Sequence, residues 1–224
     1  MLNGEGRITS TREPEASPGP LLSLARSPTG CAWAVRADVP DDVARELDDL
    51  AREEPPVLDL RDPPVHADRY LSLLTDAIRL WQQPTARIRH SAGPAFTFPD
   101  MLTQSHEAVI VEDERLLQHN FRGWIAGEIA AGRSPVTAVV RDGHPVSICF
   151  SARCSDVAAE AGVETAEAFR GQGFGSRVTA ASALAIRASG RIPLYSTSWT
   201  NGASLAVARK LGLIAYASDW SLCD

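Results

Sequence analysis

Three glycines at alternate positions, Gly171, Gly173 and Gly175, lie in the segment RGQGFGS late in this 224-residue chain. The segment follows a short apolar run and precedes an alanine-rich stretch, so we expect it to join a strand to a helix. The first backbone N–H groups of a helix have no partners within the helix, and glycines let the backbone approach a ligand closely. The pattern therefore predicts a loop that binds a phosphate group.

Two common phosphate-binding loops do not fit this segment. A P-loop places Lys and then Ser or Thr after its last glycine, whereas Ser176 and Arg177 follow Gly175 here. A dinucleotide-binding fold requires G-x-G-x-x-G and an acidic residue about 20 positions later, but the corresponding stretch GRIPLYS has no acid. Only about 50 residues follow the loop, too few for a doubly wound sheet.

Two motifs in order resemble the GNAT superfamily of N-acetyltransferases. Arg170, Gly173 and Gly175 match its pyrophosphate loop, R/Q-x-x-G-x-G/A, between a strand and a helix. The segment NGASLAVARKLGL (201–213) resembles its second motif, in which a strand, an asparagine, a short helix and G-F/L follow one another. The resemblance covers roughly residues 95 to 224 and implies acetyl-CoA, or a longer acyl-CoA, as cosubstrate with no metal.

The resemblance also implies which residues hold the cosubstrate. The pantetheine arm would lie between the strand before the loop and the next strand, against the backbone of Val163 and Thr165. A backbone N–H there would polarise the thioester carbonyl. The remaining expected contacts come from the loop and the second motif: Arg170, Gly171, Gln172, Gly173, Phe174, Gly175, Ser176 and Asn201.

An amine must be neutral to attack a thioester, so a general base is expected. Glu160 and Glu164 are the candidates, because the period of two in a strand places both on one face; the alternative is a solvated strand face. Many family members carry a tyrosine seven residues after the asparagine as general acid, but this chain has Ala208 there. Where some relatives place a glutamate on the second strand, this chain has Ser196. Ser204, Tyr195 or Tyr216 could substitute as the acid, or the thiolate could leave unprotonated.

The elements that must position these residues follow from periodicity and turn signals. The fold class is α/β (α+β): a GNAT-like mixed, mostly antiparallel central sheet flanked by helices, with an N-terminal α/β extension. One apolar helical stripe precedes this region and is made of Tyr70, Leu71, Leu74, Ile78 and Trp81. The clearest hairpin is 135–151, around Asp142-Gly143. Strands are predicted at 31–40, 95–100, 106–113, 157–165, 193–199 and 213–220, and helices at 41–54, from about 67, 113–132, 176–189 and 201–212.

The composition and the residue pattern indicate where the domains begin and end, which partners are expected and in which compartment the protein lies. Residues 1–28 are rich in Gly, Pro, Ser and charge, which predicts a largely disordered arm, followed by an extension over 29–94 and the acetyltransferase domain over 95–224. A net charge of −6 argues against nucleic acid as the main partner. No apolar run reaches the length of a membrane span, so no membrane partner is expected. With no apolar signal core and four cysteines lacking zinc-ligand spacing, buried free thiols in the cytoplasm are the expectation.

The sequence thus predicts transfer of an acetyl or acyl group from acetyl-CoA to a primary amine. The acidic chain favours a cationic acceptor, either a small molecule or a peptide, and the oligomeric state is left open. The alternative is a non-catalytic acyl-CoA-binding sensor or scaffold, which the missing tyrosine supports.

Overall fold

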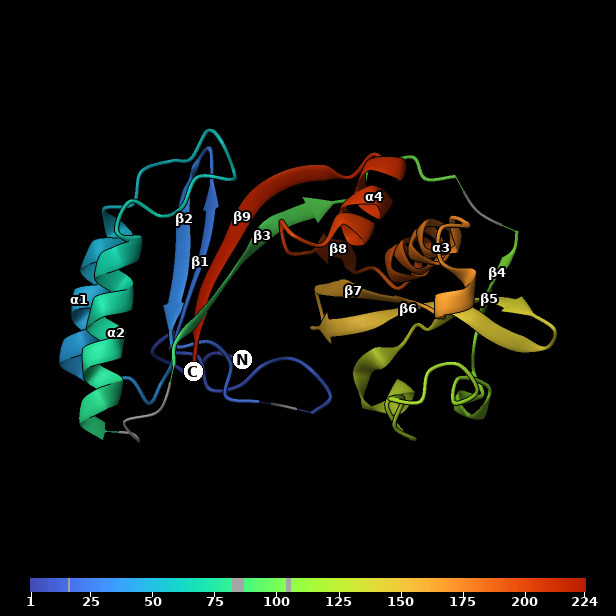
Figure 1. Ribbon diagram of the computed structural model, residues 1–224, viewed down its shortest axis with the longest axis horizontal. Helices are drawn as coiled ribbons and strands as arrows, with labels where there is room; N and C mark the ends of the chain where they lie inside the picture. Colours follow the sequence, from blue (N-terminus) through green and yellow to red (C-terminus); the bar gives the residue numbers. More distant parts are fainter. Residues whose placement is uncertain (16, 82–86, 104–105) are drawn as a thin grey trace.

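The protein, described here from a computed structural model over residues 1–15, 17–81, 87–103 and 106–224, is built on one nine-stranded sheet (Figure 1). The strand order is β2-β1-β9-β3-β8-β7-β6-β5-β4, and all neighbours are antiparallel except β7 and β8. The mixed, mostly antiparallel sheet is the one that the sequence predicts. The strands are β1 (Leu22–Ser27), β2 (Gly30–Val35), β3 (Arg89–Thr97), β4 (Ala108–Ile110), β5 (Thr137–Arg141), β6 (His144–Cys154), β7 (Ala158–Thr165), β8 (Ile192–Ser196) and β9 (Ile214–Cys223).

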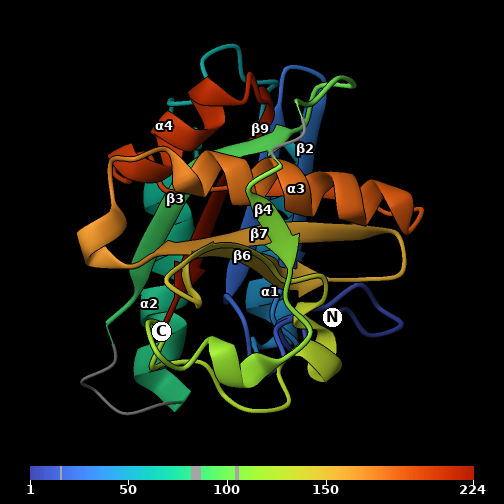
Figure 2. The same cartoon turned by 90° about the vertical axis from the view of Figure 1, so that its right-hand side faces the viewer.

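Four α-helices lie against this sheet: α1 (Asp41–Arg52), α2 (Ala67–Trp81), α3 (Phe174–Ala188) and α4 (Gly202–Lys210). On β3, Ala92 packs against the cluster beneath α1 and α2, and Phe96 packs with residues of α3 and α4. Because strand residues of the same parity face the same side, all four helices cover one face of the sheet. Figure 2 shows α3 lying alongside β7 at the β4 end of the sheet.

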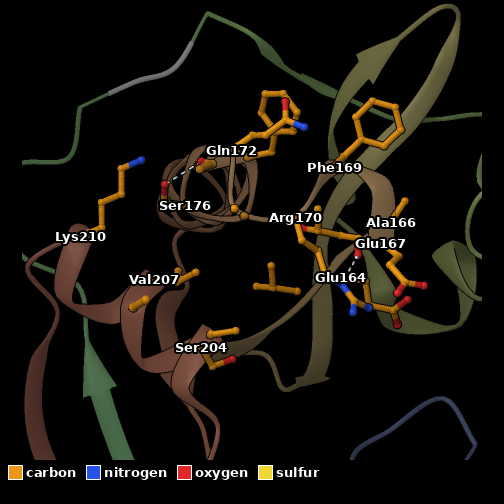
Figure 3. A pocket seen from close by; sticks show the side chains of 18 of the residues that line it. Glu164, Ala166, Glu167, Phe169, Arg170, Gln172, Ser176, Ser204, Val207 and Lys210 are labelled. Atoms are coloured by element: carbon orange, nitrogen blue, oxygen red, sulfur yellow. Dashed lines mark hydrogen bonds between the residues drawn. The ribbon is translucent and has the colours of Figure 1, made fainter.

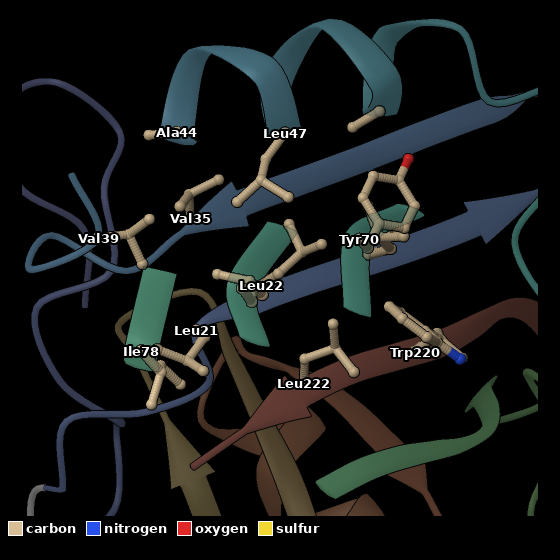
Figure 4. Packing of buried hydrophobic residues seen from close by; sticks show 13 residues of the cluster. Leu21, Leu22, Val35, Val39, Ala44, Leu47, Tyr70, Ile78, Trp220 and Leu222 are labelled. Carbon is tan, nitrogen blue, oxygen red and sulfur yellow. The ribbon is translucent and has the colours of Figure 1, made fainter. Parts of the chain in front are cut away.

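The N-terminal region shares the sheet and has its own apolar core (Figure 4). Tyr70, Leu74 and Ile78 of the predicted stripe are buried there beside Trp220 and Leu222 of β9. Leu71 is exposed instead, and the side chain of Trp81 lies outside the described residues. The core thus joins the first third of the chain to its last strand.

The predicted disordered arm over residues 1–28 was wrong in its last part, because β1 pairs with both β2 and β9. Leu21 and Leu22 are fully buried, and their burial supplies the free energy that offsets the ordering of this segment. Ile8 also forms a bridge with Arg36 and is buried. Turn-forming residues dominate the composition of residues 1–28, so the composition does not reveal the six-residue strand β1 at its end.

β3 lies between β8 and β9 and is antiparallel to both. The predicted boundary at residue 95 therefore falls inside a strand. Gly93 allows the close approach of the segment after β8, since a Cβ there would lie 1.7 Å from the carbonyl oxygen of Thr197. The sheet that carries the second half of the chain is thus completed by a strand from the first half.

The helix predicted over 113–132 was also wrong: this segment contains a short 3₁₀ helix (Glu114–Leu116), turns and a π-helical turn (Ile129–Arg133). The Glu114 carboxylate accepts hydrogen bonds from the backbone N–H groups of Gly127 and Ile129, both at 2.6 Å. Gly127 and Gly132 adopt positive φ, which interrupts a regular helix. The apolar residues Leu117, Phe121 and Trp124 are still buried, on the sheet face opposite α3.

Candidate active site: a cavity between two diverging strands

The site is formed where β7 and β8 separate. The two strands pair only between Ala158–Glu160 and Ile192–Leu194. Beyond this point β7 continues beside β6 as far as Thr165, and β8 continues beside β3. A cavity of about 980 Å³ opens in the gap, large enough for an extended ligand.

Several elements line this cavity (Figure 3). The end of β7 and the glycine loop form one side, and α4 forms the other. Tyr195 of β8, together with Asn120 and Phe121 from the irregular segment, completes the lining. Of the residues predicted from sequence, the cavity brings together Val163, Glu164, Thr165, Arg170, Gly171, Gln172, Gly173, Phe174, Gly175, Ser176, Asn201 and Ser204.

The backbone of β7 is open toward the gap. The N–H of Ala166 donates to the carbonyl of Val146 on β6. Because the N–H and C=O groups of successive strand residues point to opposite sides, those of Val163 and Thr165 point away from β6. The carbonyl of Thr165 accepts from Arg170, so the N–H groups of Val163 and Thr165 and the carbonyl of Val163 are the groups open to an extended ligand where β8 has diverged. This is where the sequence predicts a pantetheine arm.

The glycine loop ends in a helix N-terminus without a side-chain cap. Gly171 and Gly173 have φ of 76° and 77°, a conformation that glycine adopts without strain. The hydroxyl of Ser176 donates to the carbonyl of Gly173 at 2.8 Å, and no acidic residue lies in the first turn of α3. The unpaired N–H groups and the helix dipole together favour an anion here, which fits the pyrophosphate of a CoA molecule.

The side chains beside the glycines make different contacts: some are held by backbone carbonyls, and one packs beneath the loop. Arg170 lines the cavity, but its Nε donates to the carbonyl of Thr165 at 3.2 Å, which holds the side chain back along the end of β7. Gln172 donates to the carbonyl of Ala168 at 3.5 Å. Phe174 is buried, and the guanidinium of Arg141 lies 4.7 Å from the centre of its ring. In this geometry Phe174 supports the loop, while Arg170 is anchored to β7.

α4 carries the second predicted motif. The side chain of Asn201 accepts a hydrogen bond from the N–H of Ser204 at 3.1 Å, so it caps the helix and also lines the cavity. Ala208, at the position where the family often has a tyrosine, is buried in the core beside α3. Ser204 lines the cavity, and the hydroxyl of Tyr195 donates to its carbonyl at 3.3 Å.

The two candidate bases occupy different places on β7. Glu164 is exposed and lines the cavity near the loop. Glu160 is half-buried at the last pairing with β8, outside the cavity lining, where it accepts a hydrogen bond from Ser196 and lies 3.7 Å from Arg153. Nearby, burial raises the pKa of Asp219. Strand geometry separates Glu160 and Glu164 by about 13 Å, so they cannot act on the same atom.

Lys210, at the end of α4, lines the cavity and was missed from the sequence. Nothing in the sequence shows that this lysine lies above the glycine loop, because the two are separated by α3 and β8.

Within the described parts of the chain, no group of three or more His, Cys, Asp or Glu side chains could hold a metal ion. All four cysteines carry free thiols, and burial raises the pKa of Cys149 to about 12.

Comparison with known proteins identifies the fold and family around this cavity. Residues 133–218 match the family model of the GNAT acetyltransferases. This region belongs to the GNAT acetyltransferase family. The match spans the GNAT hairpin β5–β6, the glycine loop and α4, so it contains the divergence of β7 and β8. No protein among those with curated functions matches the chain.

Solved structures show a similar fold. A GNAT-family acetyltransferase from Novosphingobium aromaticivorans is 18% identical, with a TM-score of 0.51 over 62% of this chain and 67% of that one. A GCN5-related N-acetyltransferase-like protein from Streptococcus suis is 15% identical, with a TM-score of 0.50 over 91% of this chain and 84% of its own. A Drosophila protein is 14% identical, with a TM-score of 0.53 over 91% and 73%. Among the described helices, none is long and apolar enough to cross a membrane.

Proposed function

We propose that the protein binds acetyl-CoA between β7 and β8 and transfers the acetyl group to a primary amine. The observation that supports this proposal is the combination of an uncapped α3 N-terminus with the open backbone of β7, joined by one cavity. The loop would hold the pyrophosphate, and the N–H groups of Val163 and Thr165 would hold the arm. When bound, acetyl-CoA supplies an activated thioester.

The direction of the cavity assigns roles along β7. The glycine loop follows the end of β7, so the pyrophosphate end of the ligand lies near Thr165 and the acyl end near the last β7–β8 pairing. Glu160 lies at that acyl end, and we therefore assign it as the base that takes a proton from the amine. Glu164, nearer the loop, is the alternative. Ser204 presents a hydroxyl from α4 to the same cavity and is the candidate proton donor to the thiolate.

The expected acceptor is a cationic primary amine on a small molecule or a peptide. The half-buried carboxylates of Glu160 and Asp219 make the acyl end of the site acidic, with Arg153 as the nearby cation. An ammonium group is attracted to such a site before it gives up a proton. This assignment agrees in sign with the net charge of −6 on the chain.

A second function is favoured by one observation. The buried Ala208 removes the usual tyrosine of the family, which is compatible with a sensor or scaffold that binds acyl-CoA without turnover. The two functions differ in one measurable product. A catalyst releases CoA thiol when an amine is present, whereas a sensor binds acetyl-CoA and releases none.

A thermal-shift titration with acetyl-CoA, with NAD and ATP as controls, tests both functions. A ligand that binds only the folded state raises the melting temperature as its concentration passes the dissociation constant. A rise with acetyl-CoA alone is the expected result, and an amine library is then screened for thiol release. No shift with acetyl-CoA would contradict both functions, and a shift without thiol release across the library would favour the sensor.

A further inference from the structure

A cation approaches the glycine loop from the other side of the cavity. Lys210 is the last residue of α4, and its side chain extends toward the loop (Figure 3). Its Nζ lies 2.5 Å from the position that a Cβ on Gly173 would occupy. Lys210 and Gly173 both line the cavity, so the ammonium faces the space in front of the loop.

This placement brings two positive groups together. The N-terminus of α3 carries a partial positive charge, and its first turn holds no acidic residue. Among the described residues, Lys210 forms no ion pair. An ammonium beside an uncapped helix N-terminus is electrostatically unfavourable unless an anion lies between the two.

Arg170 does not place its charge in the space in front of the glycine loop. Its guanidinium is turned back and donates to Thr165 at the end of β7. The C-terminus of α4 favours cations in its last turn, which accounts equally for Arg209 and Lys210. Only Lys210 reaches the cavity, so the helix dipole of α4 does not explain where its ammonium lies.

We infer that Lys210 binds the pyrophosphate of the CoA ligand and closes the loop from the α4 side. This inference rests on the proposed function. The ammonium supplies the positive charge that the sequence motif assigns to Arg170, and the backbone N–H groups of α3 supply the directed hydrogen bonds. Because Lys210 is exposed, its replacement leaves the core unchanged.

Isothermal titration calorimetry at low ionic strength tests the assignment. Lys210→Gln is expected to weaken acetyl-CoA binding by about tenfold, the lower end of the range for a hydrogen bond to a charged group. Arg209→Gln is the matched control, because Arg209 is an exposed cation in the same turn outside the cavity lining, and its affinity is expected to stay within about twofold of the wild type. Circular dichroism melting curves establish that both variants are folded.

A second ligand identifies the phosphate that is bound. Dephospho-CoA keeps the pyrophosphate and lacks the 3′-phosphate, so the same loss in Lys210→Gln is expected with it. A loss with CoA and none with dephospho-CoA would overturn the assignment to the pyrophosphate.

Three other results also decide the matter. If the wild type does not bind acetyl-CoA, the proposed function fails and the inference fails with it. If the wild type binds and Lys210→Gln binds equally well, only the role of Lys210 is overturned. Equal losses in the Lys210 and Arg209 variants would show a general charge effect and would also overturn it.

Discussion

Ser196 of β8 donates its hydroxyl to the carboxylate of Glu160 on β7, directly beside the last pairing of the two strands. The hydrogen bond joins the strands at the point where they begin to diverge. It holds the carboxylate of Glu160 at the last β7–β8 pairing, outside the lining of the cavity. Under the proposed function, this hydrogen bond orients the carboxylate that we assign as the base.

Glu160→Gln is expected to lower kcat at least about a hundredfold at neutral pH, since a positioned general base contributes about that much or more. The amide oxygen can still accept from Ser196, so the affinity for acetyl-CoA should change by less than about twofold. Steady-state kinetics with calorimetry measures both. Glu164→Gln is the matched control and should lower kcat by less than about fivefold. The opposite pattern would assign the base to Glu164.

Gly173→Glu is expected to abolish acetyl-CoA binding, because the side chain fills the phosphate path and repels the ligand. Gly190→Glu is the matched control. Gly190 has a similar φ of 80°, lies at the opposite end of α3 and has open space around it. Both variants pay a similar backbone cost, so only the loss of binding should distinguish them in calorimetry. Retained affinity in Gly173→Glu would show that the loop is not the phosphate site.

Gly93→Ala tests the insertion of β3 between β8 and β9. A Cβ at this position would lie 1.7 Å from the Thr197 carbonyl oxygen and 2.9 Å from the Cα of Ser198, so backbone must move. We expect a loss of about 3 kcal/mol, or a melting temperature lower by roughly 6 to 12 °C. Gly123→Ala, with no atom near its new Cβ, should melt within about 2 °C of the wild type. Equal melting of the two variants would contradict the close approach.

Asp219→Asn is expected to stabilise the protein near neutral pH. Burial is the main cause that raises the pKa of Asp219, and Glu160 raises it further while Arg153 opposes them. A carboxyl whose pKa is higher in the folded state favours folding at acidic pH, and this contribution is lost as pH rises through the folded-state value. The gain in melting temperature should therefore shrink as the pH falls through the folded-state pKa of Asp219, and it should be lost once the pH is below the usual pKa of Asp. A gain that grows on acidification would reverse the sign of the shift.

The sequence predicts the second half of the fold because its signals are local. Asp142-Gly143 marks a hairpin, and Gly171 to Gly175 mark the turn from β7 into α3, so these elements lie where they are expected. The helix over 113–132 fails for a reason that spacing does not reveal. The side chain of Glu114 takes the N–H groups of Gly127 and Ile129, and this competing partner lies 13 or more residues away.

In the candidate site, too, residues of local motifs could be predicted, and residues placed by packing between distant elements could not. The residues of the loop and Asn201 could be predicted because they belong to contiguous motifs. Lys210 could not, since its relation to Gly173 depends on how α4 packs against the loop. The separation of Glu160 from the cavity lining likewise depends on where β7 and β8 stop pairing, which is a contact between strands distant in the sequence.

The position of β3 has a consequence for the order in which the chain is made. Residues 89–97 leave the ribosome well before either neighbouring strand, at 192–196 and 214–223. β1 also pairs with β9, so the final strand is required by two strands from the first half of the chain. A nascent chain that stops short of residue 214 leaves both with an unpaired edge, which is a site for aggregation and for recognition by chaperones. The synthesis of β9 thus decides whether β1 and β3 can both be paired on this side of the sheet.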